Sequence, residues 1–100
     1  MTEQELNAAA LKVARAIVAD GGADFSMDFV DVAMTYGVSF GVAIAAVELL
    51  YVQEYVDVRE TWNDGVLEEL AFTRTTKQGT PESFDAVKRR VRRAARMAAR

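Results

Sequence analysis

A stretch almost free of charge is the feature that most restricts how this chain folds. Between residues 40 and 53 only Glu48 is charged, and nearly all the other residues are apolar. Ser39 is a typical N-cap residue, so the sequence predicts a helix from Phe40 to Gln53. A helix that is apolar on almost every side is either enclosed by the fold or covered by a partner. The sequence leaves both interpretations open.

The chain has 100 residues and is 51% hydrophobic, which is enough for one core that encloses such a helix. It contains neither His nor Cys. It therefore has no imidazole base, no thiolate nucleophile, no disulfide framework and no ordinary zinc site. We expect a protein without enzyme activity, with no catalytic residues, no metal site, no cofactor and no small-molecule substrate.

No targeting or membrane-spanning segment is expected. The first five residues include two acidic side chains and no basic one, whereas a secretory signal begins with basic residues. The longest uncharged run covers residues 32–47, which is 16 residues. This is shorter than the roughly 18–20 apolar residues that a bilayer requires. The sequence predicts a cytoplasmic protein that does not bind membranes.

Two helices are expected before the apolar one. Thr2 and Glu5 have the spacing of a capping box, and Gly21 and Gly22 end the first helix. Its apolar stripe consists of Leu6, Ala10, Val13 and Ile17.

The second helix is expected to begin at Ser26 and to end at Gly37. Phe25 and Val30 have the spacing of a hydrophobic staple around this start. Asp28 and Asp31 lie one turn apart, as in a shared metal or proton site, but acids in a first turn more often complement the helix dipole. Its predicted buried face consists of Phe29, Val32, Ala33 and Tyr36.

A β-hairpin is expected after the apolar helix. Residues 55–61 alternate and are rich in β-formers, and residues 63–65 are a turn signal. A three-residue loop pairs Val58 with Leu70, Val56 with Phe72 and Arg59 with Glu69. It is preferred over a two-residue loop of Asp64 and Gly65, which would pair Arg59 with Leu70 and Asp57 with Phe72, because it keeps apolar residues opposite each other. Trp62 beside the turn either covers the hairpin against the body or is an exposed contact residue.

A basic helix is expected at the C-terminus, with Thr80 as its cap and Pro81 at its first position. Residues 81–100 contain seven basic and two acidic side chains, a net charge of +5, whereas residues 1–80 carry −8. The formal net charge of −3 therefore conceals two oppositely charged parts. We divide the chain into residues 1–78 and a basic helix in residues 79–100, which packs on the first part or extends from it.

The segment between the second and third helices has the pattern of a helix-turn-helix. Ala33 precedes Gly37 by four residues, and an apolar residue and the capping Ser39 follow. Residues 26–75 resemble the winged helix-turn-helix domain of MarR-like regulators, with residues 63–65 as the wing tip. The resemblance implies a mainly α fold with a small β-hairpin (α+β), to which the basic helix is added. A small all-helical bundle is the alternative.

The resemblance implies sequence-specific DNA binding, with the third helix in the major groove and the wing on the backbone. Glu54 stands where the family often has Gly. The groove-facing positions carry none of the Arg, Lys, Asn or Gln side chains that read bases, and the wing is acidic. The groove-facing positions are Phe40, Gly41, Ile44, Ala45 and Glu48, and the acids are Glu60, Asp64, Glu68 and Glu69.

Two hypotheses about function follow. In the first, the chain is a small regulatory protein that forms a dimer and binds DNA through its basic helix. The phosphate contacts come from Lys88, Arg89, Arg92, Arg93 and Arg96. In the second, it is a protein–protein interaction module, such as an inhibitor, adaptor or phage-type factor. It then binds a protein partner or a second copy through the apolar helix and the acidic hairpin. The partner-binding residues are Phe40, Ile44, Glu48 and Trp62.

Overall fold

The computed structural model describes residues 1–20 and 26–98, which form four helices and a three-stranded antiparallel sheet. The predicted α+β class is confirmed, and the all-helical alternative is wrong because residues 56–74 form the hairpin. In chain order the elements are α1 (Glu3–Asp20), β1 (Ser26–Asp28), α2 (Phe29–Tyr36), α3 (Phe40–Val52), β2 (Val56–Asn63), β3 (Val66–Arg74) and α4 (Phe84–Ala98).

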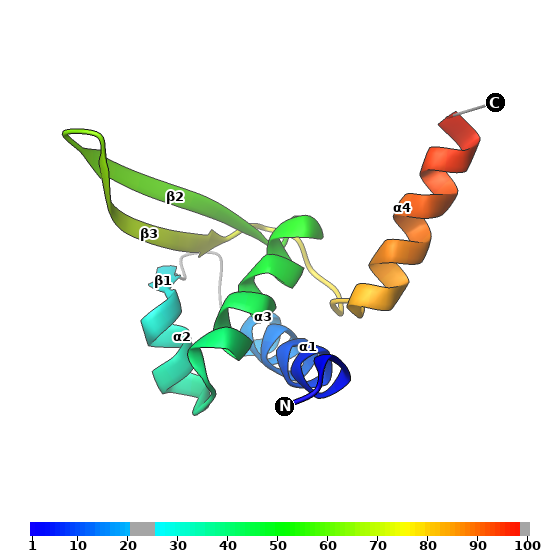
Figure 1. The fold of residues 1–100 in the computed structure, drawn as a ribbon, viewed down its shortest axis with the longest axis horizontal. Coiled ribbons are helices and arrows are strands. Elements are labelled where there is room, and N and C mark those ends of the chain that lie inside the picture. The colour runs from blue at the N-terminus through cyan, green and yellow to red at the C-terminus, as the bar shows by residue number, and fades with distance from the viewer. Residues whose placement is uncertain (21–25, 99–100) are drawn as a thin grey trace.

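The core lies where α1 packs against α3 (Figure 1). Ala10 and Ala14 of α1 and Ala43 and Ala46 of α3 are fully buried, so small side chains let the two helices approach closely. The predicted stripe on α1 and its capping box are confirmed, since the Glu5 amide donates to Thr2 Oγ1 at 3.1 Å. The expected glycine cap at residues 21–22 and the staple residue Phe25 lie outside the described residues.

Helix α3 is enclosed on one side only. Val42, Val47, Leu49 and Leu50 are buried, as are the two alanines, whereas Phe40 at the start of the helix is 50% exposed. The helix begins as predicted, because the Val42 amide donates to Ser39 Oγ at 3.2 Å. The interpretation of a helix enclosed by the fold therefore applies to one side of α3, and the other side is exposed.

Helix α2 begins at Phe29 rather than at Ser26. The preceding residues form β1, which pairs with β3 and places Met27 opposite Phe72. Asp28 is the cap: the Asp31 amide donates to its side chain at 2.8 Å, and the Asp28 amide donates to Asp31 at 3.4 Å. The two acids therefore form a capping box. The predicted buried face is confirmed, with Val32 fully buried and the other three residues partly buried.

The predicted hairpin register is wrong. The turn has two residues, Asp64 and Gly65, both with positive φ, which matches the right-handed twist of the strands. Glu68 has no partner on β2 and forms a bulge that shifts the pairing by one residue. Val58 therefore lies opposite Phe72, rather than Leu70, and apolar residues still face each other. The other pairs shift as well, and Val56 lies opposite Arg74 and Arg59 opposite Ala71.

Helix α4 begins at Phe84 rather than at Pro81. Pro81 is buried in the connector, and its carbonyl accepts a hydrogen bond from Arg15 Nε at 3.2 Å. Ser83 takes the capping position, because its Oγ accepts from the Ala86 amide at 3.2 Å. The hydrogen bond from Arg15 holds Pro81 on the body as part of the connector. Helix α4 therefore begins three residues later than predicted.

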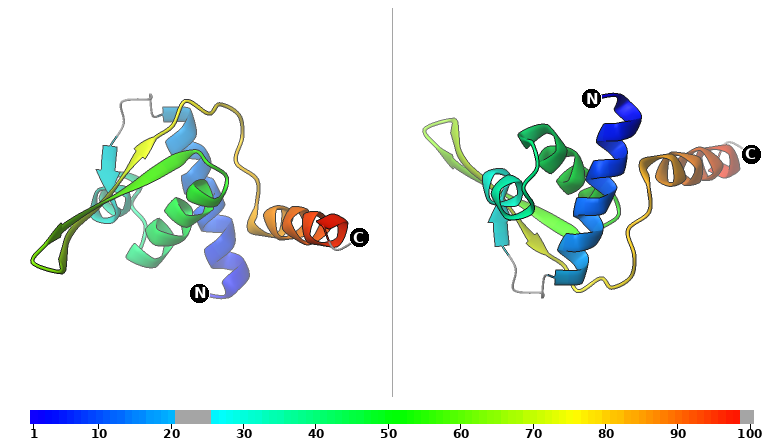
Figure 2. Two further views of the ribbon diagram at one scale, coloured as in Figure 1. Left: turned by 90° about the horizontal axis from the view of Figure 1, so that it is seen from above. Right: turned by 90° about the horizontal axis from the view of Figure 1, so that it is seen from below.

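Two arms project from the helical body on opposite sides, the β2–β3 hairpin and α4 (Figures 1 and 2). The Cα radius of gyration is 14.7 Å, above the roughly 13 Å of a compact chain of this length. Within the described residues no single helix is long and apolar enough to cross a membrane. Only α2 and α3 together reach that composition, and they are bent by 112°.

Candidate functional site

Four arginines form one face of α4. Arg89, Arg92, Arg93 and Arg96 are spaced by three and four residues, which places them side by side on a helix. All four are exposed and together line a shallow hollow. We call this set the arginine cluster. The structure thus brings together four of the five predicted phosphate-binding residues, and Lys88 lies beside them near the apolar stripe.

Only the first turn of α4 is anchored. Phe84 and Val87 are partly buried against the core, and from Lys88 to Ala98 every residue is exposed. Among the described residues, the ion pair that α4 forms joins Arg90 to Glu82, and both side chains are about half exposed. An exposed pair of this kind contributes little stability. The arginine cluster therefore extends into solvent with its charges available.

The base of α4 is attached to the end of α3 by a buried amide. Gln53 Nε2 donates to the carbonyls of Leu49 at 3.2 Å and Glu82 at 3.0 Å, and the Glu82 amide donates to Gln53 Oε1 at 2.8 Å. Arg74 is buried beside it and donates to the Tyr55 carbonyl at 2.7 Å. These bonds fix where the arm begins, and thereby which side of the body the cluster extends from.

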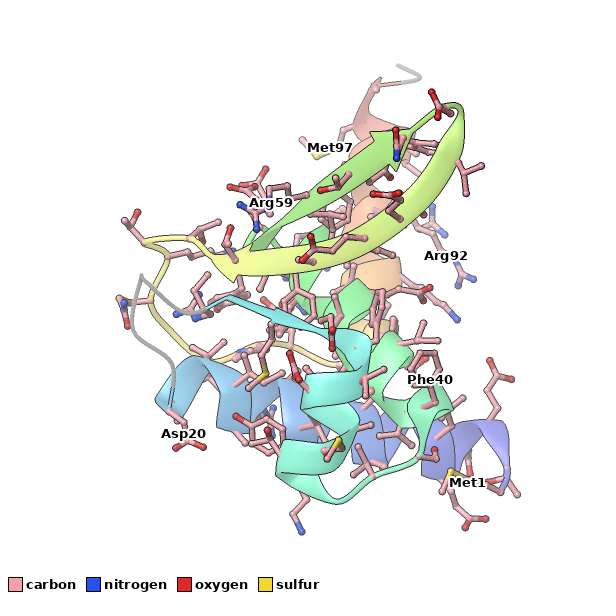
Figure 3. All side chains as sticks on the ribbon, turned by 90° about the vertical axis from the view of Figure 1, so that its left-hand side faces the viewer. Met1, Asp20, Phe40, Arg59, Arg92 and Met97 are labelled. Atoms are coloured by element: carbon pink, nitrogen blue, oxygen red, sulfur yellow. The ribbon has the colours of Figure 1, made fainter. Side chains whose placement is uncertain are left out.

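A second surface runs along the outward side of α3 and onto the hairpin. Phe40, Glu48 and Tyr51 are exposed, and Ile44 between them is partly buried. The Phe40 ring meets Phe29 edge-on, with centroids 6.3 Å apart. Figure 3 shows Arg59 on the side of the hairpin away from Phe40. The α3 side of the hairpin therefore carries no arginine from β2.

This surface contains an apolar groove between α3 and the hairpin, with a volume of about 300 Å³. The groove contains two carboxylates and no cationic side chain, so it is both apolar and acidic. We call it the hairpin groove. Its lining residues are Phe29, Val47, Glu48, Tyr51, Val58, Glu60 and Leu70.

Trp62 extends the hairpin groove toward the tip of the arm. It lies two residues beyond Glu60 on β2 and donates from Nε1 to Glu60 Oε2 at 2.9 Å. Its side chain is 58% exposed, so the interpretation in which it covers the hairpin against the body is wrong. The hairpin that carries it projects away from the helical body (Figure 1). Of the four predicted partner-binding residues, Glu48 lines the groove, and Phe40, Ile44 and Trp62 lie on the surface around it.

Sequence reasoning missed the five apolar residues of the groove, Phe29, Val47, Tyr51, Val58 and Leu70. Tyr51 could have been predicted from the sequence, because Tyr51 continues the helical spacing of Phe40, Ile44 and Glu48 along α3. The sequence already places Val58 and Leu70 on one face of the hairpin, but only the fold shows that this face lies beside α3.

The acidic residues do not form a metal site in the described part of the chain, where no group of three or more His, Cys, Asp or Glu side chains converges. Asp28 and Asp31 are the capping box of α2. One titratable group stands out: partial burial, and then the Asp20 carboxylate, raise the pKa of the Tyr36 phenol. Tyr36 packs beside α1, away from both surfaces.

Comparison of the chain with protein-family models, with curated proteins and with solved structures found no match.

Proposed function

We propose that this protein is a small regulatory protein that binds the phosphate backbone of duplex DNA through the arginine cluster of α4. The observation that carries the proposal is the exposure of four guanidinium groups on one face of an arm that projects from the body. Arginine is well suited to phosphate, because its planar fork donates two parallel hydrogen bonds. Lys88 adds a fifth cation beside the cluster. Contacts of this kind give affinity with little sequence readout.

We further propose that the body is a winged helix-turn-helix-like domain, which places the protein among cytoplasmic regulators. Its element order and its sheet order β1-β3-β2 support this assignment. So does the 112° bend between α2 and α3, which lies within the roughly 90–120° of helix-turn-helix pairs. Gly37 supplies the left-handed residue that this sharp turn requires, with φ of 62°.

The charge distribution favours α4 over the usual docking elements of such a domain. The outward side of α3 presents Phe40, Ile44 and Glu48, which supply no donor for a base edge. The hairpin carries five exposed acids, and these repel phosphates. Residues 1–80 carry a net charge of −8, so α4 is where phosphate binding is electrostatically favourable.

A salt series of duplex-DNA binding tests the proposal. For four phosphate contacts we expect the logarithm of the association constant to fall against the logarithm of salt concentration with a slope of about −3.6. The double substitution Arg93→Glu and Arg96→Glu removes two cations and adds two anions on one helical face. It is expected to abolish binding at low salt, measured by fluorescence anisotropy.

The matched control is Lys12→Glu with Arg59→Glu, which changes the net charge by the same amount at exposed positions outside α4. It is expected to weaken binding only slightly. Equal losses from the two double variants would mean that overall charge, rather than the cluster, governs binding. Absence of binding by the unmodified protein at low salt would contradict the proposal outright.

A second candidate function is protein interaction through the hairpin groove. Single exposed apolar residues are common, but here the exposed Tyr51 and Val58 line one groove. The half-exposed Phe40 packs against Phe29 of that groove, and Trp62 is bonded to its Glu60. Contiguous apolar surface of this kind marks interaction sites. The carboxylates of Glu48 and Glu60 specify a partner that is apolar and basic.

Substitution of Ile44 by Lys tests whether the outward side of α3 is free surface. Ile44 is only partly buried, and a lysine there can extend its ammonium group into water. We expect Ile44→Lys to unfold cooperatively near the wild-type temperature and to bind less of an environment-sensitive hydrophobic dye. Val47→Lys is the control, since Val47 is 2% exposed and a buried charge is expected to unfold the protein. If Ile44→Lys unfolds as well, α3 is core on both sides.

A further inference from the structure

The hairpin groove has no occupant within the described chain. It presents the apolar side chains of Tyr51, Val58 and Leu70, and its two charges are the carboxylates of Glu48 and Glu60. The Glu60 carboxylate is held by the Trp62 indole at 2.9 Å and stays exposed. A complementary occupant therefore has an apolar stripe with cations beside it.

The outer part of α4 has this chemistry. Val91 is 62% exposed and begins an apolar stripe that continues through Ala94, Ala95 and Ala98. Lys88 and Arg90 lie on either side of the stripe on the helix surface. The stripe is narrow and its side chains are small, so the helix backbone can come close to a concave surface.

The groove and the stripe of one chain do not meet. The hairpin and α4 project on opposite sides of the body (Figures 1 and 2), and Gln53 fixes the base of α4 at its position. The two complementary surfaces of one chain are therefore available to a second copy.

We propose that α4 of one protomer docks its apolar stripe into the hairpin groove of a second copy, and that the exchange is reciprocal. Reciprocal docking gives a symmetric dimer, in which each copy supplies one groove and one helix. One alanine-rich helix buries only a modest area in one groove. The reciprocal exchange doubles the buried area, toward the roughly 1,200 Å² that a stable interface buries. The acidic groove and the basic helix also attract each other.

Direct pairing of α4 with α4 is disfavoured. Val91, Ala94 and Ala98 have heptad spacing, but only this short segment is free, because Phe84 and Val87 already pack on the core. Two helices that each carry a large net positive charge also repel each other. The hairpin groove offers the same stripe an apolar surface of opposite charge.

The dimer uses the side of α4 opposite to the arginine cluster. Arg93 and Arg96 lie across the helix from Val91 and Ala94, so docking of the stripe leaves them exposed. The proposal therefore does not depend on DNA binding. The double variant Arg93→Glu and Arg96→Glu is expected to remain dimeric, and its failure to bind DNA would leave this proposal intact.

Sedimentation velocity of the full chain and of two single variants, up to millimolar concentration, tests the dimer. Tyr51→Arg places a cation in the groove, and Val91→Asp places an acid in the stripe; both positions are more than half exposed, so both variants are expected to fold. Each variant alone is expected to self-associate about tenfold or more weakly than the wild type. Met34→Arg, at a 77% exposed position on α2 that does not line the groove, is the control and is expected to dimerise normally.

Mixing the two variants gives the decisive result. The helix of Tyr51→Arg and the groove of Val91→Asp are both intact, which leaves one contact unchanged. In the other contact the introduced arginine meets the introduced aspartate, so the mixture is expected to form a one-to-one heterodimer. Thermal unfolding followed by circular dichroism confirms that each variant is folded. A wild-type chain that stays monomeric would overturn the proposal. Dimerisation of Tyr51→Arg with the wild-type affinity would also overturn it, because the groove would then not be needed and α4–α4 pairing would be indicated. Two monomeric variants that fail to combine would also overturn it.

Discussion

Glu54 has an unusual backbone conformation among the described residues. Its φ of 66° lies in the left-handed region, which costs an ordinary residue roughly 1 kcal/mol or more and glycine almost nothing. The conformation ends α3: the Glu54 amide donates to the Tyr51 carbonyl at 3.1 Å, and the Tyr55 amide donates to Leu50 at 2.9 Å.

Replacement of Glu54 by Gly is therefore expected to stabilise the fold. Glycine removes the free-energy cost of the left-handed backbone, and this gain exceeds the loss from the greater conformational entropy of glycine in the unfolded chain. The free energy of unfolding should therefore rise by up to about 1 kcal/mol. Urea unfolding followed by circular dichroism measures it. Asp57→Gly is the control, because φ at Asp57 is not positive and glycine there should destabilise. Destabilisation by both substitutions would show that the Glu54 side chain contributes more than its backbone costs.

Helix caps determine where the elements begin and end. Ser39 and Gly37 bracket the turn between α2 and α3, and the Ser39 hydroxyl satisfies the Val42 amide. Helix α3 packs on α1, and its end is bonded to the connector that carries α4, so its stability is that of the whole body. Ser83 caps α4 in the same way, but α4 has no buried residue.

Substitution of each capping serine by Ala should have different effects on the free energy of unfolding for the two helices. Ser39→Ala is expected to lower the global free energy of unfolding by about 1 kcal/mol, because a buried helix loses its cap. Ser83→Ala should leave that value unchanged and reduce only the helical signal below the transition, since α4 frays independently of the body. Thermal and urea unfolding measure both effects. Equal losses would mean that α4 is part of the cooperative unit.

The elements that sequence predicts well are those with local signals. Thr2, Gly37 and Ser39 mark helix ends by their own chemistry, so α1 and α3 were predicted nearly to the residue. Strand β1 was missed because three residues show no alternation and form a strand only by pairing with β3. The bulge at Glu68 and the buried position of Pro81 likewise depend on contacts that are distant in sequence.

At the scale of the whole molecule, the two surfaces differ in how far the sequence reveals them. The arginine cluster follows from helical spacing within α4, so its members could be named from the sequence. The hairpin groove combines residues from α2, α3, β2 and β3, and only the fold brings them together. Tertiary structure also separates the charges, with the acidic body on one side of the connector and the basic arm on the other.

The projecting hairpin has a further consequence, for the state of the protein at high concentration. Within the described residues β2 pairs only with β3, so its outer edge presents free amides and carbonyls along its whole length. Such an edge is a template for pairing with other strands, and eventually for aggregation. The hairpin carries five acids, Asp57, Glu60, Asp64, Glu68 and Glu69, against two arginines, so two such hairpins repel each other. The acids that make this arm a poor ligand for phosphates thus also keep one hairpin from adding to the edge of another.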